Sequence, residues 1–184
     1  GMRIVVCVKH VPDMQSERRF EGGRLVRGED DVLNELDENA IEAAVQLKES
    51  EEDAGREAEV VALTMGPEDA EDSLMRALQM GADRAFIVSD EFLEGSDVIT
   101  TASVLAVAIA KIGEECGPVD LVITGMASLD AMTSMLPGAL AAKAHMPLLG
   151  LARSLSVEDG AVTIEHAVDG YTETVRAALP AVVS

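Results

Sequence analysis

Aromatic side chains are nearly absent from this chain of 184 residues. It has no Trp, one Tyr and three Phe, so aromatics make up 2% of the sequence while apolar residues make up 48%. A core must therefore be built from Ala, Val, Leu, Ile and the nine Met. These residues suit close-packed parallel strands covered by Ala-rich helices. The length allows one domain of ordinary size with a substantial core.

Positive charge is also scarce. The chain has 14 Lys and Arg against 34 Asp and Glu, which gives a net charge of −20. A surface this acidic repels a phosphate backbone, and the sequence has no basic stripe, so we expect no nucleic-acid partner. A site for a small phosphate ligand would have to use backbone N–H dipoles, because few cations are available.

Paired cysteines and long apolar runs are missing as well. Cys7 and Cys116 form no CxxC or metal-spaced cluster, which indicates reduced, partly buried thiols in a cytoplasmic protein. The longest candidate membrane stretch, residues 100–110, is roughly half of the ~20 residues that span a bilayer. We therefore expect no membrane insertion, and the short apolar start does not read as a signal peptide.

Sequence motifs of catalysis are absent. None of the patterns GxxxxGK[ST], GxGxxG, GxSxG or HExxH occurs. The histidines, His10, His145 and His166, are spread over the chain, and His10 is either a general base or a solvated loop residue. The acidic run at residues 49–53 indicates the solvated end of a helix. We expect no catalytic residues, and so a protein that is not an enzyme by itself.

What the sequence does have is a regular alternation of strand and helix signals. Short apolar runs that end in turn signals predict buried strands at residues 3–8, 59–65, 84–89 and 120–125. Helical patterns follow them, at residues 37–49, 67–80 and 96–112 and from about Thr133. This order predicts an α/β fold with a doubly wound parallel sheet. We expect the core of that sheet to bury Val5, Val61, Ile87 and Val122.

Two segments depart from the alternation. Residues 9–33 form a long connection with a hairpin insertion at about 18–28, which turns on Gly22-Gly23. From about Leu148, strand-like residues alternate around two Asp-Gly pairs, which predicts an appended antiparallel ribbon over residues 148–184. No clean boundary divides the chain, so we read residues 2–184 as a single nucleotide-binding domain and Gly1 as a remnant of an expression tag.

Residues 121–138 are the strongest sign of a binding site. An apolar run ends at Thr124-Gly125, small side chains follow, and a helix-like segment starts near Thr133. A buried strand that feeds a loop opening a helix presents backbone N–H groups to a phosphate. An ordinary connection with nothing bound explains the same pattern equally well.

Other segments are expected to reach the same edge of the sheet. Residues 7–10, Met65-Gly66 and residues 125–132 all follow or end predicted parallel strands, and Asn34 precedes a helix. The carboxyl ends of parallel strands meet along one edge, where open α/β sheets bind ligands. The groups expected there are backbone amides and one amide side chain. They favour the binding of an anionic nucleotide over a catalytic role.

Five segments, in order along the chain, resemble the β subunit of electron transfer flavoproteins. They are VCVKHVPD at residues 6–13, LNELDENAIEAAVQLKE at 33–49, MGPEDAEDSLMRALQMGADRAFIVSD at 65–90, DLVITGMASLD at 120–130 and LPAVVS at 179–184. The resemblance implies a Rossmann-like domain of the adenine nucleotide α-hydrolase kind. It also implies a larger α subunit as partner, which carries the FAD and passes on electrons from dehydrogenases, while the β subunit binds AMP structurally.

The resemblance also implies the positions that contact AMP. Carried over position by position, these are Cys7, Asn34, Met65, Ser128, Asp130, Ala131, Thr133, Ser134, Met135 and Leu136. Related chains are usually Gly-rich or polar over residues 131–136. Ala131 would be strained if its φ were positive, so we expect AMP binding to be retained, weakened or lost according to the backbone there.

Members of that family continue for some tens of residues past the final Leu-Pro-Ala-Val-Val. The additional arm wraps the α subunit and includes the loop that contacts partner dehydrogenases. This sequence ends at Ser184, so we do not expect dehydrogenase docking from these residues alone. It is either a shortened relative or a paralogue that kept the nucleotide domain and lost that docking.

Two other functions remain open. The first is a stand-alone adenine-nucleotide-binding protein similar to universal stress proteins, which would form homodimers through its C-terminal strands and prefer ATP to AMP. The second, less favoured because candidate catalytic groups are missing, is a hydrolase or ligase of the same fold.

Overall fold

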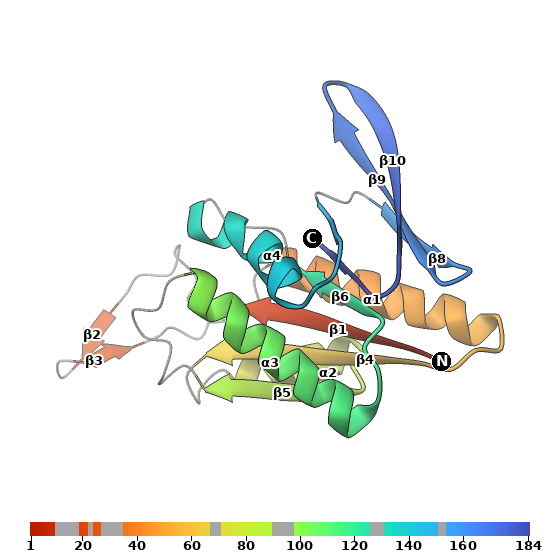
Figure 1. Ribbon diagram of the computed structural model, residues 1–184. Helices are drawn as coiled ribbons and strands as arrows, with labels where there is room; N and C mark the ends of the chain where they lie inside the picture. Colours follow the sequence, from red (N-terminus) through yellow and green to blue (C-terminus); the bar gives the residue numbers. More distant parts are fainter. Residues whose placement is uncertain are drawn as a thin grey trace.

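The computed structural model describes residues 1–9, 19–21, 24–26, 35–66, 71–89, 98–125, 131–150 and 154–184. The chain folds around a six-stranded sheet with helices on both faces, as Figure 1 shows. A smaller antiparallel sheet stands out from this body. The predicted fold class, a doubly wound α/β sheet with an appended antiparallel ribbon, is confirmed.

Every neighbouring pair in the large sheet is parallel, in the order β5-β4-β1-β6-β11-β7. The strands are β1 (Met2–Lys9), β4 (Ala58–Gly66), β5 (Arg84–Ser89), β6 (Leu121–Thr124), β7 (Leu148–Leu149) and β11 (Ala181–Val183). The predicted strands at residues 3–8, 59–65, 84–89 and 120–125 therefore all exist, within one residue at each end. Continuous apolar runs were readable because these strands are covered on both faces.

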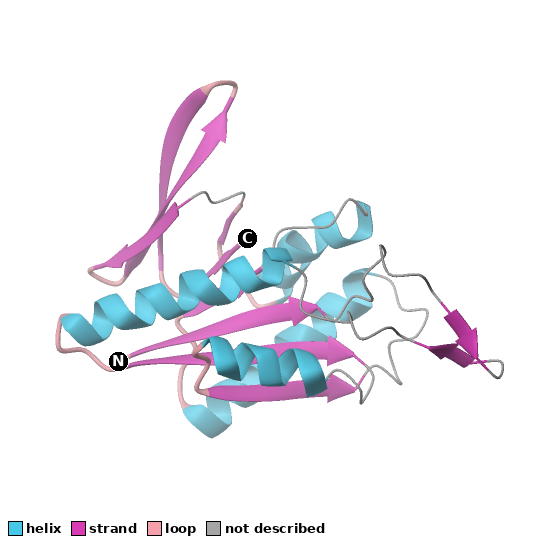
Figure 2. Cartoon of the chain, turned by 180° about the vertical axis from the view of Figure 1, so that it is seen from behind, coloured by secondary structure: helices cyan, strands magenta, loops and turns pink. Residues whose placement is uncertain are grey.

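In the part of the chain that the structure describes, four helices cover the sheet. They are α1 (Glu35–Asp53), α2 (Glu71–Met80), α3 (Val98–Cys116) and α4 (Ala131–Lys143). In Figures 1 and 2, α1 and α2 lie on one face and α3 and α4 on the other. Alternate strand residues feed two separate cores: Ile4 packs in the cluster that includes Ile41 of α1, and Val5 in the cluster that includes Leu105 of α3.

The prediction that Ile87 is buried is wrong, whereas Val5, Val61 and Val122 are fully buried. Ile87 is 37% exposed because β5 is the edge strand of the sheet and pairs only with β4 among the described strands. A central strand has neighbours on both sides, and an edge strand does not. The apolar run at residues 84–89 has the same appearance in both situations.

Two aspartates fix the amino ends of the parallel strands by the same arrangement. The Asp120 amide donates to the Arg3 carbonyl, and Asp120 Oδ2 accepts from the Arg3 amide at 2.9 Å. The Asp83 amide donates to the Val60 carbonyl at 2.8 Å, and Asp83 Oδ2 accepts from the Val60 amide at 2.9 Å. Each aspartate precedes its own strand and is held to the start of the neighbouring strand.

The acidic run at residues 49–53 is not wholly a solvated helix end. Glu51 is only 8% exposed, and its carboxylate accepts from Arg56 Nε at 2.7 Å and Arg56 Nη2 at 3.2 Å. The Glu51 side chain packs inward, and a nearby arginine satisfies its charge. The prediction missed this pair because the run itself contains no cation.

A small hairpin lies in the long connection after β1. Strand β2 (Arg19–Glu21) pairs antiparallel with β3 (Arg24–Val26), with Phe20 opposite Leu25. The expected turn, Gly22-Gly23, lies outside the described residues. Figures 1 and 2 both show the hairpin beyond the carboxyl ends of the parallel strands.

The second sheet contains β8 (Ser154–Glu158), β9 (Ala161–Val168) and β10 (Tyr171–Ala178), all antiparallel. Asp159-Gly160 and Asp169-Gly170 turn between them with positive φ at all four residues, as two-residue hairpin turns require. The predicted ribbon was too long at both ends. Strands β7 and β11 join the parallel sheet instead, because residues 181–183 are buried on both faces, like the central strands.

A crevice at the carboxyl edge of the sheet

The chain leaves neighbouring strands β1 and β6 toward opposite faces of the sheet. The next helix after β1 is α1 on one face, and the next after β6 is α4 on the other. The two strands pair directly, with Cys7 beside Thr124. Divergent connections at adjacent strands form the topological switch point at which open α/β sheets bind ligands. The fold therefore places its candidate site beyond the carboxyl ends of β1 and β6.

The structure brings part of the predicted site to this edge. Cys7 is half-buried on β1, and Met65 lies on β4 beside Lys9 of β1. Residues 131–136, which include Ala131, Thr133, Ser134, Met135 and Leu136, form the first turns of α4. The side chains of Met65 and of residues 131–136 are outside the described part of the chain. Asn34, Ser128 and Asp130 are outside the described residues altogether.

Ala131 does not have the strained backbone that a positive φ would impose. Ala131 is the first residue of α4, and helical residues have negative φ. Alanine has the highest helix propensity of all residues, so Ala131 is free of the backbone strain that a positive φ would cause. Because α1 and α4 run opposite to the strands, each begins at the carboxyl edge. Their N-terminal N–H groups are partial positive charges on this side of the sheet.

Sequence reasoning did not single out the hydroxyls of Thr64 and Thr124. Thr64 is fully buried and Thr124 is 7% exposed, and within the structure as described neither Oγ1 has a hydrogen-bond partner. A buried hydroxyl without a partner is uncommon in folded proteins. The only sequence signal is a threonine in the last two positions of each apolar run. A donor of this kind at the edge of β6 fits a ligand that offers an acceptor oxygen, such as a phosphate.

The described histidines do not gather at this edge. His145 follows the C-terminal end of α4, which lies at the amino edge of the sheet. His166 lies on β9, where its Nδ1 is 3.1 Å from the carbonyl oxygen of Gly150. His10 is outside the described residues. Nor does the described part of the chain arrange three or more His, Cys, Asp or Glu as a metal site.

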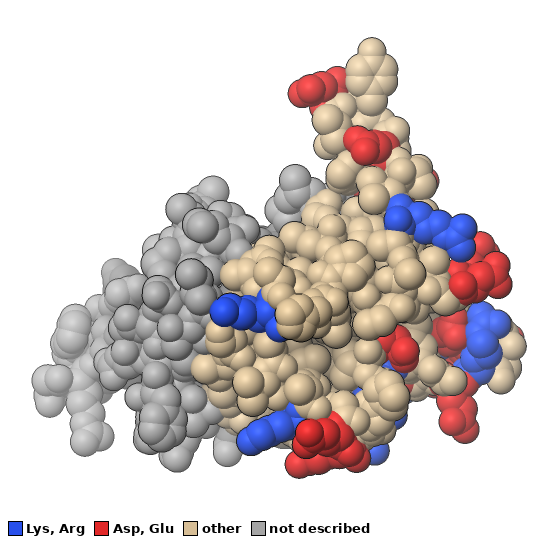
Figure 3. Space-filling model, viewed as in Figure 1, with Lys and Arg blue, Asp and Glu red and all other residues tan. Residues whose placement is uncertain are grey.

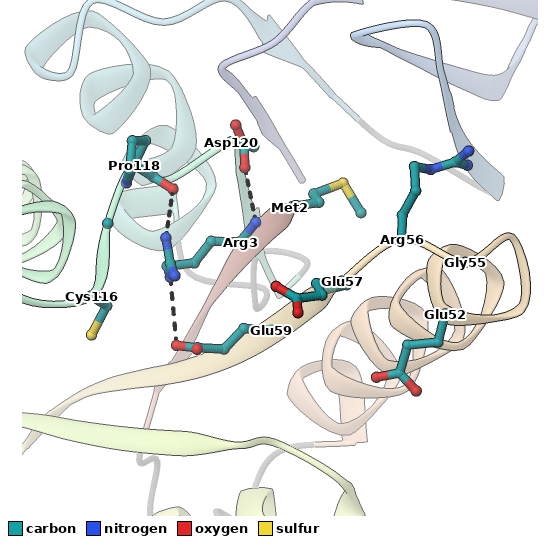
Figure 4. A pocket seen from close by; sticks show the side chains of 13 residues that line it. Met2, Arg3, Glu52, Gly55, Arg56, Glu57, Glu59, Cys116, Pro118 and Asp120 are labelled. Carbon is teal, nitrogen blue, oxygen red and sulfur yellow. Dashed lines mark hydrogen bonds and ion pairs between the residues drawn. The ribbon is translucent and has the colours of Figure 1, made fainter.

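A groove of about 910 Å³ opens at the opposite, amino edge of the sheet. It is lined by the first residues of β1, the α1–β4 connection and the α3–β6 connection (Figure 4). Two of its charged side chains, Arg3 and Glu59, form an ion pair. Arg3 Nε lies 3.5 Å from Glu59 Oε1, and Arg3 Nη1 donates to the Pro118 carbonyl at 3.0 Å.

Arg84 adds to the same network. Its Nε lies 3.3 Å from Glu59 Oε1, and its Nη1 donates to Cys116 Sγ at 3.1 Å. These contacts join the ends of β1, β4, β5 and α3, so the groove is best explained as structural. The amino ends of the strands are also the side on which sheets of this kind do not place their ligands.

Charge is unevenly distributed over the described surface. On the face seen in Figure 3, acidic and basic side chains lie close together at the margins, and few lie over α3 and α4. Val107 of α3 is 58% exposed on that helix.

Helices of the described part all fall short, in length or in apolar character, of what a bilayer crossing requires.

Comparison with known proteins gives a consistent result. The electron transfer flavoprotein domain matches residues 23–184 of this chain. A protein named electron transfer flavoprotein subunit beta from Mycobacterium leprae is 41% identical, covering 98% of this chain and 68% of the relative. A protein of the same name from Megasphaera elsdenii is 36% identical over 94% of this chain and 64% of its own length.

A differently named relative matches as well. Protein FixA of Azorhizobium caulinodans is 35% identical over the whole of this chain and 65% of its own length. The similarity therefore spans nearly all of the present sequence and about two thirds of each relative.

Proposed function

Because this chain belongs to the electron transfer flavoprotein family, which gives it an electron-transfer role, we propose that it is a β-type subunit that binds AMP structurally and scaffolds a flavin-carrying α subunit. In this proposal the α subunit holds the FAD and exchanges electrons with dehydrogenases. The present chain binds AMP and supports the α subunit, and it is not an enzyme by itself. We place the complex in the cytoplasm, since neither cysteine is in a disulfide.

The single observation that supports AMP binding is the switch point between β1 and β6. The N-termini of α1 and α4 and the buried Thr124 hydroxyl lie at this point of the sheet, and all of these groups favour an anion or an acceptor oxygen. A net charge of −20 makes such dipolar groups the main means of attracting a phosphate. FAD, when bound in the complex, would supply the redox chemistry.

The proposal is tested by calorimetric titration of the nucleotide-free chain with AMP, ATP and FAD. We expect saturable AMP binding near one per chain, and loss of it in Asn34→Ala. Asn39→Ala is the matched control, because Asn39 is an exposed residue of the same type on α1. Tight binding of ATP but not AMP, together with a homodimer, would favour the alternative similar to universal stress proteins.

Partner binding needs a separate measurement. Co-expression with the α subunit of a mycobacterial relative should give a yellow complex on size-exclusion chromatography, whereas the chain alone should be colourless. Tight, stoichiometric FAD on the isolated chain would contradict the proposed division of labour. AMP binding without complex formation would leave the nucleotide site intact and overturn the scaffolding role of these residues.

A further inference from the structure

Thr124 is in an energetically unusual position for a threonine. It ends β6, is only 7% exposed, and its Oγ1 has no hydrogen-bond partner within the described structure. Burying a hydroxyl without a partner is unfavourable, because the group loses its hydrogen bonds to water and gains none within the protein. Valine has the same shape and would fill the same space without that cost. Packing alone therefore does not account for the hydroxyl.

The hydroxyl lies on the side of the sheet from which α4 approaches. Side chains alternate along β6, and Val122 packs in the cluster that contains Leu105 of α3 and Leu140 of α4. Thr124, two residues later, is on the same face. Its direct neighbour on β1 is Cys7, which packs against the same cluster. The hydroxyl therefore sits at the switch point, on the face covered by the helix that follows β6.

We propose that the Thr124 hydroxyl donates a hydrogen bond to the phosphate of the bound nucleotide. This inference rests on the proposed function and assigns one contact within that site. A threonine hydroxyl can donate its proton, and a phosphate oxygen is an acceptor with a negative charge. The bond would satisfy the buried hydroxyl only when the ligand is present. Nucleotide binding would thereby remove a cost that the nucleotide-free protein bears.

Thr64 provides a matched control within the same molecule. Its hydroxyl is likewise buried without a partner in the described structure. Thr64 lies near the same edge on β4, which is separated from β6 by β1. Val60 and Ala62 pack toward α1, so Thr64 faces that side of the sheet, opposite to Thr124. The two threonines are thus alike in burial, in chemistry and in their position near the carboxyl ends of their strands. They differ in the face of the sheet to which they point.

The experiment compares Thr124→Val, Thr124→Ser and Thr64→Val with the unchanged chain by calorimetry and thermal unfolding. We expect Thr124→Val to weaken AMP binding by roughly 10-fold, the effect of losing one hydrogen bond to a charged group, and to leave adenosine binding unchanged. Its melting temperature without nucleotide should be equal or higher, because an unpaired hydroxyl is removed. Thr124→Ser should bind AMP within about 3-fold of the unchanged chain, since it keeps the donor.

Thr64→Val should also melt at an equal or higher temperature, but should bind AMP normally. Unchanged AMP affinity in Thr124→Val, an equal loss for adenosine, or an equal loss in Thr64→Val would each overturn the inference. If the unchanged chain binds no AMP, the proposed function fails and the inference with it. If it binds AMP and Thr124→Val does too, with the same affinity, only the inference fails.

Discussion

Single residues at the amino ends of the strands secure the sheet. Asp83 accepts from the Val60 amide and also from Lys48 Nζ, whose distance to Asp83 Oδ1 is 2.6 Å. Lys48 lies on α1, so the aspartate links a helix, the β5 end and β4. The hydrogen bond to Asp83 raises the pKa of the Lys48 ammonium above its ordinary 10.5, with burial acting in the opposite direction.

Lys48→Met should lower the free energy of unfolding by roughly 1 kcal/mol at pH 7, as expected for a well-aligned but partly exposed ion pair. The pKa of Lys48 is higher in the folded protein than in the unfolded chain, so the stabilisation is fully present below about pH 10.5. It is lost as pH rises through the folded-state pKa. Urea unfolding of both proteins at pH 7, 9 and 11 measures this.

Lys111→Met is the control for charge alone, because Lys111 is an exposed lysine with no ion pair within the described residues. It should change stability by a few tenths of a kcal/mol at most. A Lys48→Met effect that is equally large at pH 7 and pH 11 would contradict the ion-pair explanation.

At the scale of elements, apolar runs and Asp-Gly turns were reliable signals. Each predicted strand of the parallel sheet exists, and both Asp-Gly pairs turn between antiparallel strands. What the runs did not reveal was position within the sheet. Val122 and Ile87 occur in similar runs, yet β6 is central and β5 is at the edge. Strand order depends on which helices cross which face, and no short segment encodes that.

Val122→Asp tests the central place of β6. An unpaired buried charge costs several kcal/mol, comparable with the whole ~5–15 kcal/mol stability of a domain. We expect the variant to be insoluble or unfolded by circular dichroism. Val107→Asp makes the same change at a side chain that is 58% exposed on α3, and it should fold normally. A folded, soluble Val122→Asp protein would refute the assignment of β6 as a buried central strand.

At the scale of the whole molecule, the dominant property is charge. With a net charge of −20, repulsion among acidic groups opposes the compact state. Added salt screens that repulsion, because the Debye length falls from about 30 Å at 0.01 M to about 10 Å at 0.1 M ionic strength.

Raising NaCl from about 10 to 200 mM should therefore increase the melting temperature of the chain by several degrees. Differential scanning calorimetry measures the shift. KCl should give the same curve, since screening depends on ionic strength and not on the identity of the monovalent cation. A melting temperature that falls with salt would mean that local ion pairs such as Lys48–Asp83 outweigh the overall repulsion.

The sequence by itself determined the fold class and the strands and helices of the α/β alternation, because these depend on local patterns: continuous apolar runs, helical spacing and turn residues. The family followed from the resemblance of five particular segments and not from those patterns. It also directed attention to the carboxyl edge, through the small residues around Thr124-Gly125. Only the tertiary structure decided that Ile87 is exposed, that β7 and β11 complete the parallel sheet, and that Glu51 is buried against Arg56. Only it revealed the unpaired Thr124 hydroxyl. The physical reason is that burial and hydrogen-bond satisfaction depend on neighbours from distant parts of the chain, which no local pattern specifies.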